Sequence, residues 1–280
     1  MPAEVVFGLG AAVANVAVAV LSTRLAARYP ARQLLGPLFI LNCLLLLPLA
    51  PFVEWVWTPV VIALHVGTTT ALVASSVAIW DMYEKGGAAP TVTAQSVAPL
   101  PAVLLAGLLV PGSVGPVQAV AAVVVVAGVL IALRDAFGDL GRRRTAVAIL
   151  VAAVGTGVIT VFGRLLSDNG AGVVEAYVVR TALAAACCLV LFPPRDVPWR
   201  DVPRMTPRAI AITLHLTLVL LGVQGGNPAV VQTMVATGPL FVFAYDAAIH
   251  RRRPTPGLLA GGVIAFVGVA IVALSSRPPA

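Results

Sequence analysis

The sequence predicts an all-α membrane protein of ten transmembrane helices, arranged as two inverted repeats of five helices each. Three observations predict it: an apolar composition, ten apolar runs of spanning length, and a likeness between the two halves. Of the 280 residues, 60% are hydrophobic and 10% charged, with a mean hydropathy of +1.01. A soluble domain carries about 25% charged residues, because its surface must meet water. Lipid is therefore the expected solvent.

The apolar runs have the length that a bilayer requires. A helix needs about 20 mostly apolar residues to cross the hydrocarbon region, and lipid favours helices because they satisfy their own backbone hydrogen bonds. The predicted spans are residues 4–23, 33–53, 58–80, 88–110, 115–133, 145–165, 172–192, 207–225, 228–249 and 256–275.

The basic residues predict how these spans are oriented. The loops after the first, third, fifth, seventh and ninth spans hold 3, 1, 4, 4 and 3 basic residues, which is 15 of the 18 in the chain. Positive charge resists translocation, so we expect the odd-numbered loops to be cytoplasmic and both termini to lie outside the plasma membrane. The net charge of +7 then reflects topology and anionic lipid, and no nucleic-acid partner is expected.

The two halves of the chain repeat each other. A shift of 140 residues, half of the 280, superposes Pro99 on Pro239, Pro116 on Pro256, Gly128 on Gly268 and Arg24 on Arg164. Each half, 1–140 and 141–280, holds five predicted spans. An odd number of spans makes the two halves insert with opposite orientations, as in transporters whose substrate site lies between inverted repeats near the bilayer midplane.

Residues 86–99 and 115–131, and again residues 227–239 and 256–271, resemble EamA-type repeats of the drug/metabolite transporter superfamily, in its ten-helix branch. The resemblance implies a secondary transporter that moves a small organic metabolite or drug by alternating access, as an exporter. It also implies an arginine in the second helix of each repeat. Arg180 matches this position, whereas the first repeat has Ile40.

The chain departs from the family in two further ways. The glutamate that commonly follows the fourth and ninth helices is absent here. Characterised ten-helix members are usually drawn with both termini inside, whereas the arginines of this chain predict termini outside. The arginines after the first span are similar to those of NIPA-type magnesium transporters, which leaves a divalent-cation permease as an alternative. A third alternative is a non-transporting scaffold or flippase subunit.

Polar side chains within apolar runs are the candidate substrate-binding residues, because such groups are costly in hydrocarbon. Arg180 lies roughly 12 Å into its helix at 1.5 Å per residue, where a guanidinium either binds an anionic group of the substrate or forms a structural ion pair. Glu175 is expected nearer the pore mouth. The other candidates are four amides, Asn15, Asn42, Gln95 and Gln232, which either line a cavity or join helices by hydrogen bonds.

Three titratable residues are candidates for proton coupling. His65 and His215 lie within predicted spans, and histidine titrates near physiological pH; each either relays protons or donates a single interhelical hydrogen bond. His215 is also a substrate-binding candidate. Asp246 either couples protons or forms a salt bridge with Arg251 or Arg252.

Pro99 and Pro239 remove backbone donors from predicted spans, so we expect bends there that serve as hinges. No metal site is expected, since Cys43, Cys187 and Cys188 lie in apolar runs without metal-ligand spacing. No catalytic motif is present, so neither an enzyme nor a cofactor is expected. The expected partners are a small-molecule substrate and membrane lipids. A coupling ion such as the proton, and a homodimer, are compatible with the same pattern.

Overall fold

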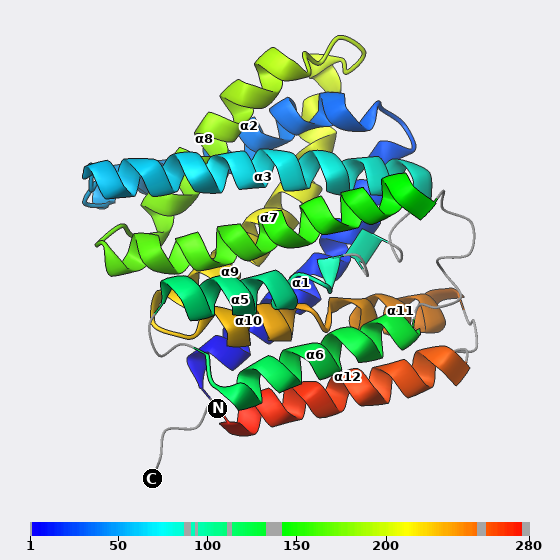
Figure 1. Cartoon of the computed structure of the whole chain (residues 1–280). Coiled ribbons are helices and arrows are strands. Elements are labelled where there is room, and N and C mark those ends of the chain that lie inside the picture. Colours follow the sequence, from blue (N-terminus) through cyan, green and yellow to red (C-terminus); the bar gives the residue numbers. More distant parts are fainter. Residues whose placement is uncertain are drawn as a thin grey trace.

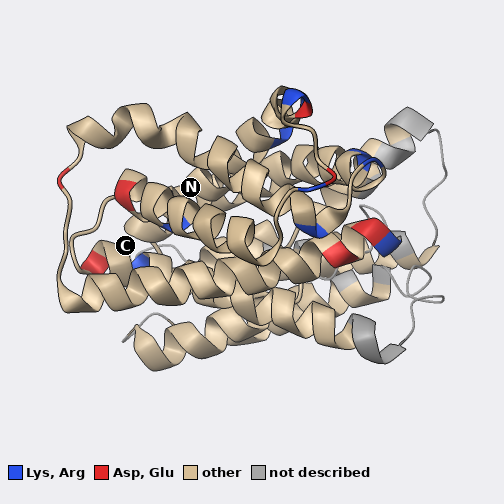
Figure 2. Ribbon diagram, turned by 90° about the horizontal axis from the view of Figure 1, so that it is seen from above, with Lys and Arg blue, Asp and Glu red and all other residues tan. Residues whose placement is uncertain are grey.

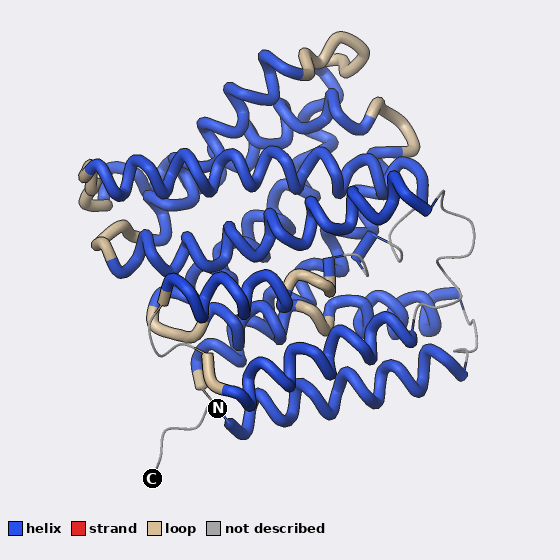
Figure 3. The backbone as a smooth tube through the Cα atoms, viewed as in Figure 1, coloured by secondary structure: helices blue, strands red, loops and turns tan. Residues whose placement is uncertain are grey.

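The computed structural model of the protein describes residues 2–86, 91–92, 95–110, 114–132, 142–250 and 256–275. All regular elements in these ranges are helices (Figures 1 and 3). The α-helices are α1 (Ala3–Ala26), α2 (Leu35–Leu46), α3 (Pro59–Gly86), α5 (Pro99–Leu109), α6 (Pro116–Ala132), α7 (Arg142–Asp168), α8 (Val173–Leu191), α9 (Thr206–Gln224), α10 (Pro228–Val235), α11 (Gly238–His250) and α12 (Pro256–Ser275). The 3₁₀ segments are η1 (Ala31–Leu34), η2 (Leu47–Phe52) and η4 (Trp199–Met205).

The helices have the length and the surface of membrane spans. In the described ranges, six helical stretches are long and apolar enough to cross a bilayer: Ala3–Ala26, Ala31–Phe52, Pro59–Lys85, Ala146–Asp168, Val173–Leu191 and Trp199–Gln224. Large apolar side chains point away from the bundle, with Leu108 and Val190 each 81% exposed. Such a surface is stable against lipid tails and unstable in water. The fold is that of a multi-pass membrane protein.

Two predicted spans are broken rather than bent. The predicted helix 228–249 is divided into α10 and α11 by a turn at residues 236–237, and α5 begins only at Pro99, after a turn at residues 96–98. Pro99 and Pro239 therefore stand in the first turn of a helix, where a missing N–H removes no hydrogen bond. At these breaks the Ser96 hydroxyl donates to the Val92 carbonyl at 3.1 Å, and the Thr237 hydroxyl donates to the Met234 carbonyl at 2.7 Å.

The two halves of the chain pack against each other through pairs of helices (Figure 1). Helix α3 lies on α7, and α1 lies on α9. In the same way α2 lies on α8, and α6 lies on α12. If α1 to α6 are matched in order with α7 to α12, each of these contacts has an equivalent contact when the halves are exchanged.

The contact between α6 and α12 is made by glycines at equivalent positions. A Cβ on Gly128 would lie 2.7 Å from the Gly261 carbonyl oxygen, and a Cβ on Gly268 would lie 3.1 Å from the Ala121 carbonyl oxygen. Both separations are shorter than ordinary van der Waals contacts. The two backbones approach this closely because both positions lack a side chain.

The charged side chains are unevenly distributed along the bundle. In Figure 2 most of the coloured basic residues lie toward one end of the helices, and the middle of the bundle is mostly uncharged. The apolar middle matches the hydrocarbon region of a bilayer, and the charged end matches its interface.

The glycine contact yields a prediction about stability. Replacing Gly128 with alanine adds a methyl group against the backbone of α12, and we expect this to destabilise the protein by about 1–3 kcal/mol. The loss should occur although alanine favours a helix over glycine by about 1 kcal/mol. Thermal unfolding of the detergent-solubilised protein measures it.

The matched control is Gly107→Ala in α5, where the nearest atom to an added Cβ is 3.9 Å away on Val114. This control should be neutral or stabilising. Equal effects of the two substitutions would show that α6 and α12 are not packed as described.

Candidate functional site

A cavity with a mostly apolar wall that also carries several polar side chains lies inside the bundle between the two halves of the chain. It is lined by residues of α1, α2, α3, α7, α9 and α10 and by Val92, Gln95 and Ser96. Its volume is about 100 Å³, and a water molecule needs roughly 10–15 Å³ of such volume. The cavity therefore has room for several water molecules or one small solute.

Five of the residues predicted to bind substrate line this cavity. They are Asn15, Asn42, Gln95, His215 and Gln232. Arg180 and His65 are not among the lining residues, and neither are Pro99 and Pro239, which follow the lining segments at the helix breaks. The side chain of Asp246 lies outside the described residues.

Two hydrogen bonds to glutamine side chains join neighbouring helices of the cavity wall, one in each half of the chain. In the first half, the Asn15 amide of α1 donates to Gln95 Oε1 at 3.3 Å. In the second half, the Thr160 hydroxyl of α7 donates to Gln232 Oε1 at 2.9 Å. Each contact joins the first helix of its half to a glutamine that precedes a helix break.

Asn42 differs from these amides because it lacks a hydrogen-bond partner in the described structure. It is 1% exposed, and neither its side-chain oxygen nor its side-chain nitrogen has a partner among the described residues. A buried polar group without a partner is destabilising unless something else supplies the hydrogen bond. Since Asn42 lines the cavity, a solute in the cavity is well placed to supply it.

His215 links α9 to α1 at the same cavity. Its Nδ1 lies 2.8 Å from the Ala11 carbonyl oxygen. Carbonyl oxygens accept hydrogen bonds, so this nitrogen carries the proton and leaves Nε2 as the acceptor of the neutral ring.

Arg208 is a cavity residue that the loop-based reading of the sequence missed. The four basic residues expected in the loop after the seventh span are Arg195, Arg200, Arg204 and Arg208. Helix α9 begins at Thr206, so Arg208 lies in its first turn instead. It is 8% exposed and lines the cavity. By contrast, the side chain of Arg204 is 71% exposed. The sequence signal was Arg208's position at the start of an apolar run, after the helix-initiating Pro207.

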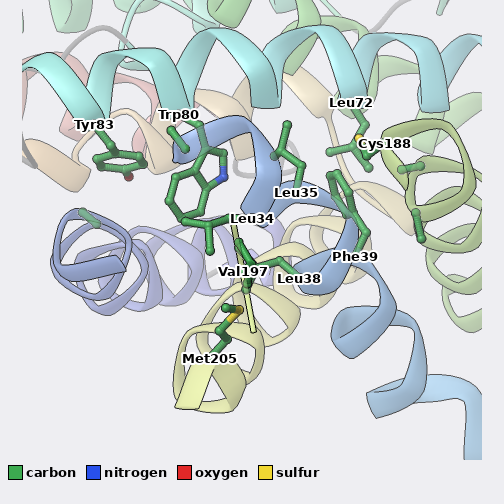
Figure 4. Close-up of a cluster of buried hydrophobic side chains, with 14 of the residues drawn as sticks. Leu34, Leu35, Leu38, Phe39, Leu72, Trp80, Tyr83, Cys188, Val197 and Met205 are labelled. Carbon is green, nitrogen blue, oxygen red and sulfur yellow. The ribbon is translucent and has the colours of Figure 1, made fainter. Parts of the chain in front are cut away.

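Two contacts hold Arg208 in place. Its Nε donates to Ser22 Oγ at 3.2 Å, and its guanidinium carbon lies 5.2 Å from the centre of the Trp80 ring. The Trp80 ring meets Tyr83 edge-on, with centroids 5.9 Å apart. Figure 4 shows both rings projecting from α3 into an apolar cluster, with Met205 on the side of the cluster opposite α3.

A second buried polar cluster lies away from the cavity, on α3 and α8. His65, Glu175 and Arg180 are 2%, 0% and 1% exposed. His65 Nε2 lies 3.6 Å from Glu175 Oε1, and the same oxygen accepts the backbone N–H of Val56 at 3.2 Å. Glu175 is therefore fully buried beneath the loop 53–58, rather than at a pore mouth.

Arg180 is covered by Tyr177. Its guanidinium carbon lies 5.8 Å from the centre of the Tyr177 ring, and the Tyr177 hydroxyl lies 2.8 Å from the Thr213 hydroxyl of α9. Nε and Nη2 of Arg180 have no hydrogen-bond partner in the described structure. The α9 residues Ile212 and Leu216, near Thr213 in sequence, line the cavity, whereas Arg180 does not.

Comparison with known proteins gives a family match in the second half of the chain and a shared fold. Residues 143–274 match the EamA-like transporter family. No curated protein matches the sequence. A solved structure, described only as the crystal structure of a protein, superposes with a TM-score of 0.76 at 18% sequence identity, over 98% of this chain and 97% of that one. At this identity the superposition shows a shared fold.

Proposed function

We propose that this chain is a secondary transporter of a small organic metabolite across the plasma membrane, a member of the EamA-like transporter family that residues 143–274 match. The observation that carries this proposal is a cavity between the two halves of the chain whose mostly apolar wall includes four amide side chains, a histidine and an arginine. A water-soluble substrate needs polar side chains along its path, since polar groups are costly in hydrocarbon. The cavity volume of about 100 Å³ suits a small solute.

The proposed architecture has ten spans in two inverted repeats, residues 1–140 and 141–280. The paired packing of α3 on α7 and α1 on α9 supports it, because a two-fold exchange of the halves turns one contact into the other. The equivalent close approaches at Gly128 and Gly268 support it as well. Transporters built in this way carry their substrate site at the interface of the repeats.

The proposed cycle is alternating access with export as its direction. The helix breaks at residues 96–98 and 236–237 follow Gln95 and Gln232 on the cavity wall, so movement at the breaks changes the wall directly. Pro99 and Pro239 act there as hinge residues. Separation of α8 from α9 at the contact between Tyr177 and Thr213 would uncover Arg180 as a substrate contact on the other side of the membrane.

The alternatives differ in what the cavity must provide. A divalent-cation permease needs several oxygen ligands, with carboxylates prominent among them. The described residues include no Asp or Glu in the cavity lining and no group of three His, Cys, Asp or Glu that suits a metal ion. A scaffold or flippase subunit needs no solute cavity of this kind, and absence of solute flux would favour it.

His65 and Glu175 are the proposed proton-coupling pair. His65 Nε2 lies 3.6 Å from Glu175 Oε1, and both side chains are buried. The groups that face them are the Arg180 guanidinium on the same helix as Glu175 and the Trp57 ring, 6.2 Å from the His65 ring. A proton taken up by this pair changes the charge of a sealed region, which favours opening it to water.

The cavity yields a prediction about Asn42→Leu. Leucine has a similar shape without the unpartnered amide, so the variant should be as stable as the parent or more stable. Saturable flux of a labelled metabolite panel into liposomes should fall, with about a tenfold rise in the half-saturating concentration for one lost hydrogen bond. The control is Thr70→Val, an exposed position on α3 outside the cavity. Unchanged flux in Asn42→Leu would remove Asn42 from the site.

The charge distribution yields a prediction about topology. With Cys43, Cys187 and Cys188 replaced by alanine, a membrane-impermeant maleimide should label Gly225→Cys in intact cells. It should label Trp199→Cys only after the membrane is permeabilised. Both positions are exposed, between α9 and α10 and before α9 respectively. The reverse labelling pattern would overturn the orientation with both termini outside.

The buried pair yields a prediction about pH. A pH gradient across the liposome membrane should drive accumulation of the substrate by the parent protein. In Glu175→Gln, which keeps the acceptor for Val56 N–H, and in His65→Asn, this driving effect should disappear while exchange of labelled for unlabelled substrate continues.

Asp168→Asn is the control for this experiment, since its side chain is 38% exposed and pairs with Arg164. Full pH-driven accumulation in both variants of the buried pair would place proton coupling elsewhere or exclude it.

A further inference from the structure

The cavity contains one charged side chain, and it is positive. Among the described residues that line this cavity, Arg208 is the only Lys, Arg, Asp or Glu. Among the described residues no carboxylate lies within 4.0 Å of Arg208 in an ion pair. Arg32, Arg164 and Arg204, by contrast, each pair with an aspartate. Within the described part of the chain, the charge of Arg208 is therefore not neutralised by a fixed acid in an ion pair.

We propose that the cavity selects small organic anions, and that Arg208 is the residue that binds their carboxylate or phosphate group. This inference rests on the proposed transport function and specifies its substrate class. An anion in the cavity supplies the missing negative charge, whereas a cation is repelled. Buried charges in proteins are ordinarily paired.

The contacts of Arg208 hold it ready for an anion. The hydrogen bond to Ser22 uses Nε, and the Trp80 ring lies under the face of the guanidinium. Neither contact occupies the edge formed by the two terminal nitrogens, which binds carboxylate or phosphate through two parallel hydrogen bonds. The side chain is thus positioned before the substrate arrives, which lowers the entropic cost of binding.

The rest of the lining suits the uncharged part of such a molecule. Asn15, Asn42, Gln95 and Gln232 supply amide groups, and Trp80 and Phe39 supply aromatic surface. Amides bind hydroxyl and carbonyl groups without adding charge. The lining therefore fits a molecule with one anionic end and a small polar or aromatic body.

An anionic substrate also has a consequence for direction. Cells are electrically negative inside, and moving one charge through 100 mV corresponds to about a fifty-fold concentration ratio. For an anion this gradient points outward. The membrane potential alone then drives export, in agreement with the proposed direction of transport.

The test uses pairs of probes that differ in charge but little in shape. The first pair is benzoate and benzamide, the second is glycerol 3-phosphate and glycerol, and benzylamine is the cationic probe. Flux of each labelled probe is measured in liposomes containing the full-length protein, with a potassium diffusion potential set by valinomycin. We expect at least one anion to move at least tenfold faster than its neutral partner, and to speed up when the potential drives anions across.

Three variants assign the selectivity to Arg208. Arg208→Gln should lose the preference for the anion by at least tenfold, and Arg208→Lys should keep part of it because the charge remains. Arg204→Gln, an exposed arginine close by in sequence, should behave as the parent. Thermal unfolding of each variant shows whether it is folded, and Arg208→Lys keeps the test decisive if Arg208→Gln is not.

The outcomes separate this inference from the proposed function. Transport of benzamide, glycerol or benzylamine as fast as the anions would overturn the anion selectivity and leave the transporter standing. An anion preference that survives in folded Arg208→Gln would also overturn it. If none of the probes moves, the metabolite panel decides. Transport of a neutral or cationic panel compound overturns the anion selectivity, and transport of an anionic one supports it. No flux of any compound would remove both proposals.

Discussion

The absence of water from the hydrocarbon region is the constraint on which the rest of the structure depends. A polar side chain that faces lipid has no hydrogen-bond partner there, so the polar groups of the membrane-spanning helices gather between the two halves of the chain. Asn15 with Gln95, and Thr160 with Gln232, form the wall of the cavity. Large apolar residues such as Leu108 and Val190 face outward. The absence of water thus accounts both for the apolar surface of the bundle and for the polar side chains in its interior.

The two helix breaks lie next to glutamines of the cavity wall, Gln95 and Gln232. Glutamines precede the breaks before α5 and α11, and the prolines that start these helices require no backbone donor there. Carbonyls near the breaks keep hydrogen-bond partners: those of Val92 and Met234 each accept both the backbone N–H and the side-chain hydroxyl of Ser96 and Thr237 respectively. The breaks therefore cost little in unpaired backbone, and they lie where a change in backbone angle alters the cavity wall.

Two buried arginines without a carboxylate partner in the described structure give the interior its electrostatic character. Arg208 lines the cavity beside Trp80, and Arg180 lies against the Tyr177 ring of α8, outside the cavity lining. Positive charge that is not neutralised by the protein is stabilised by anions from outside it. In the proposed cycle the anion contacts one guanidinium before the two halves rearrange. It contacts the other guanidinium afterwards, when the cavity opens to the other side of the membrane.

How much of the site follows from sequence differs from residue to residue. The rule that polar residues in apolar runs face an interior found Asn15, Asn42, Gln95, His215 and Gln232, and the structure places all five on the cavity. The same rule named Arg180 and His65, which are buried but outside the cavity lining. The depth of a residue along a helix is readable from sequence, but the neighbour that its face meets is not. Arg208 was missed because counting loop charges treats every arginine near a helix end as solvated.

The sequence by itself determined the helical membrane class and the neighbourhood of both helix breaks, because composition, hydropathy and proline act locally along the chain. The tertiary structure alone decided which arginine borders the cavity and that Glu175 meets His65 beneath the loop 53–58. These contacts join helices far apart in sequence, and they depend on how each helix is rotated against its neighbours. In a chain so uniformly apolar, hydropathy hardly distinguishes one face of a helix from another. Packing against neighbouring helices therefore determines which face is buried.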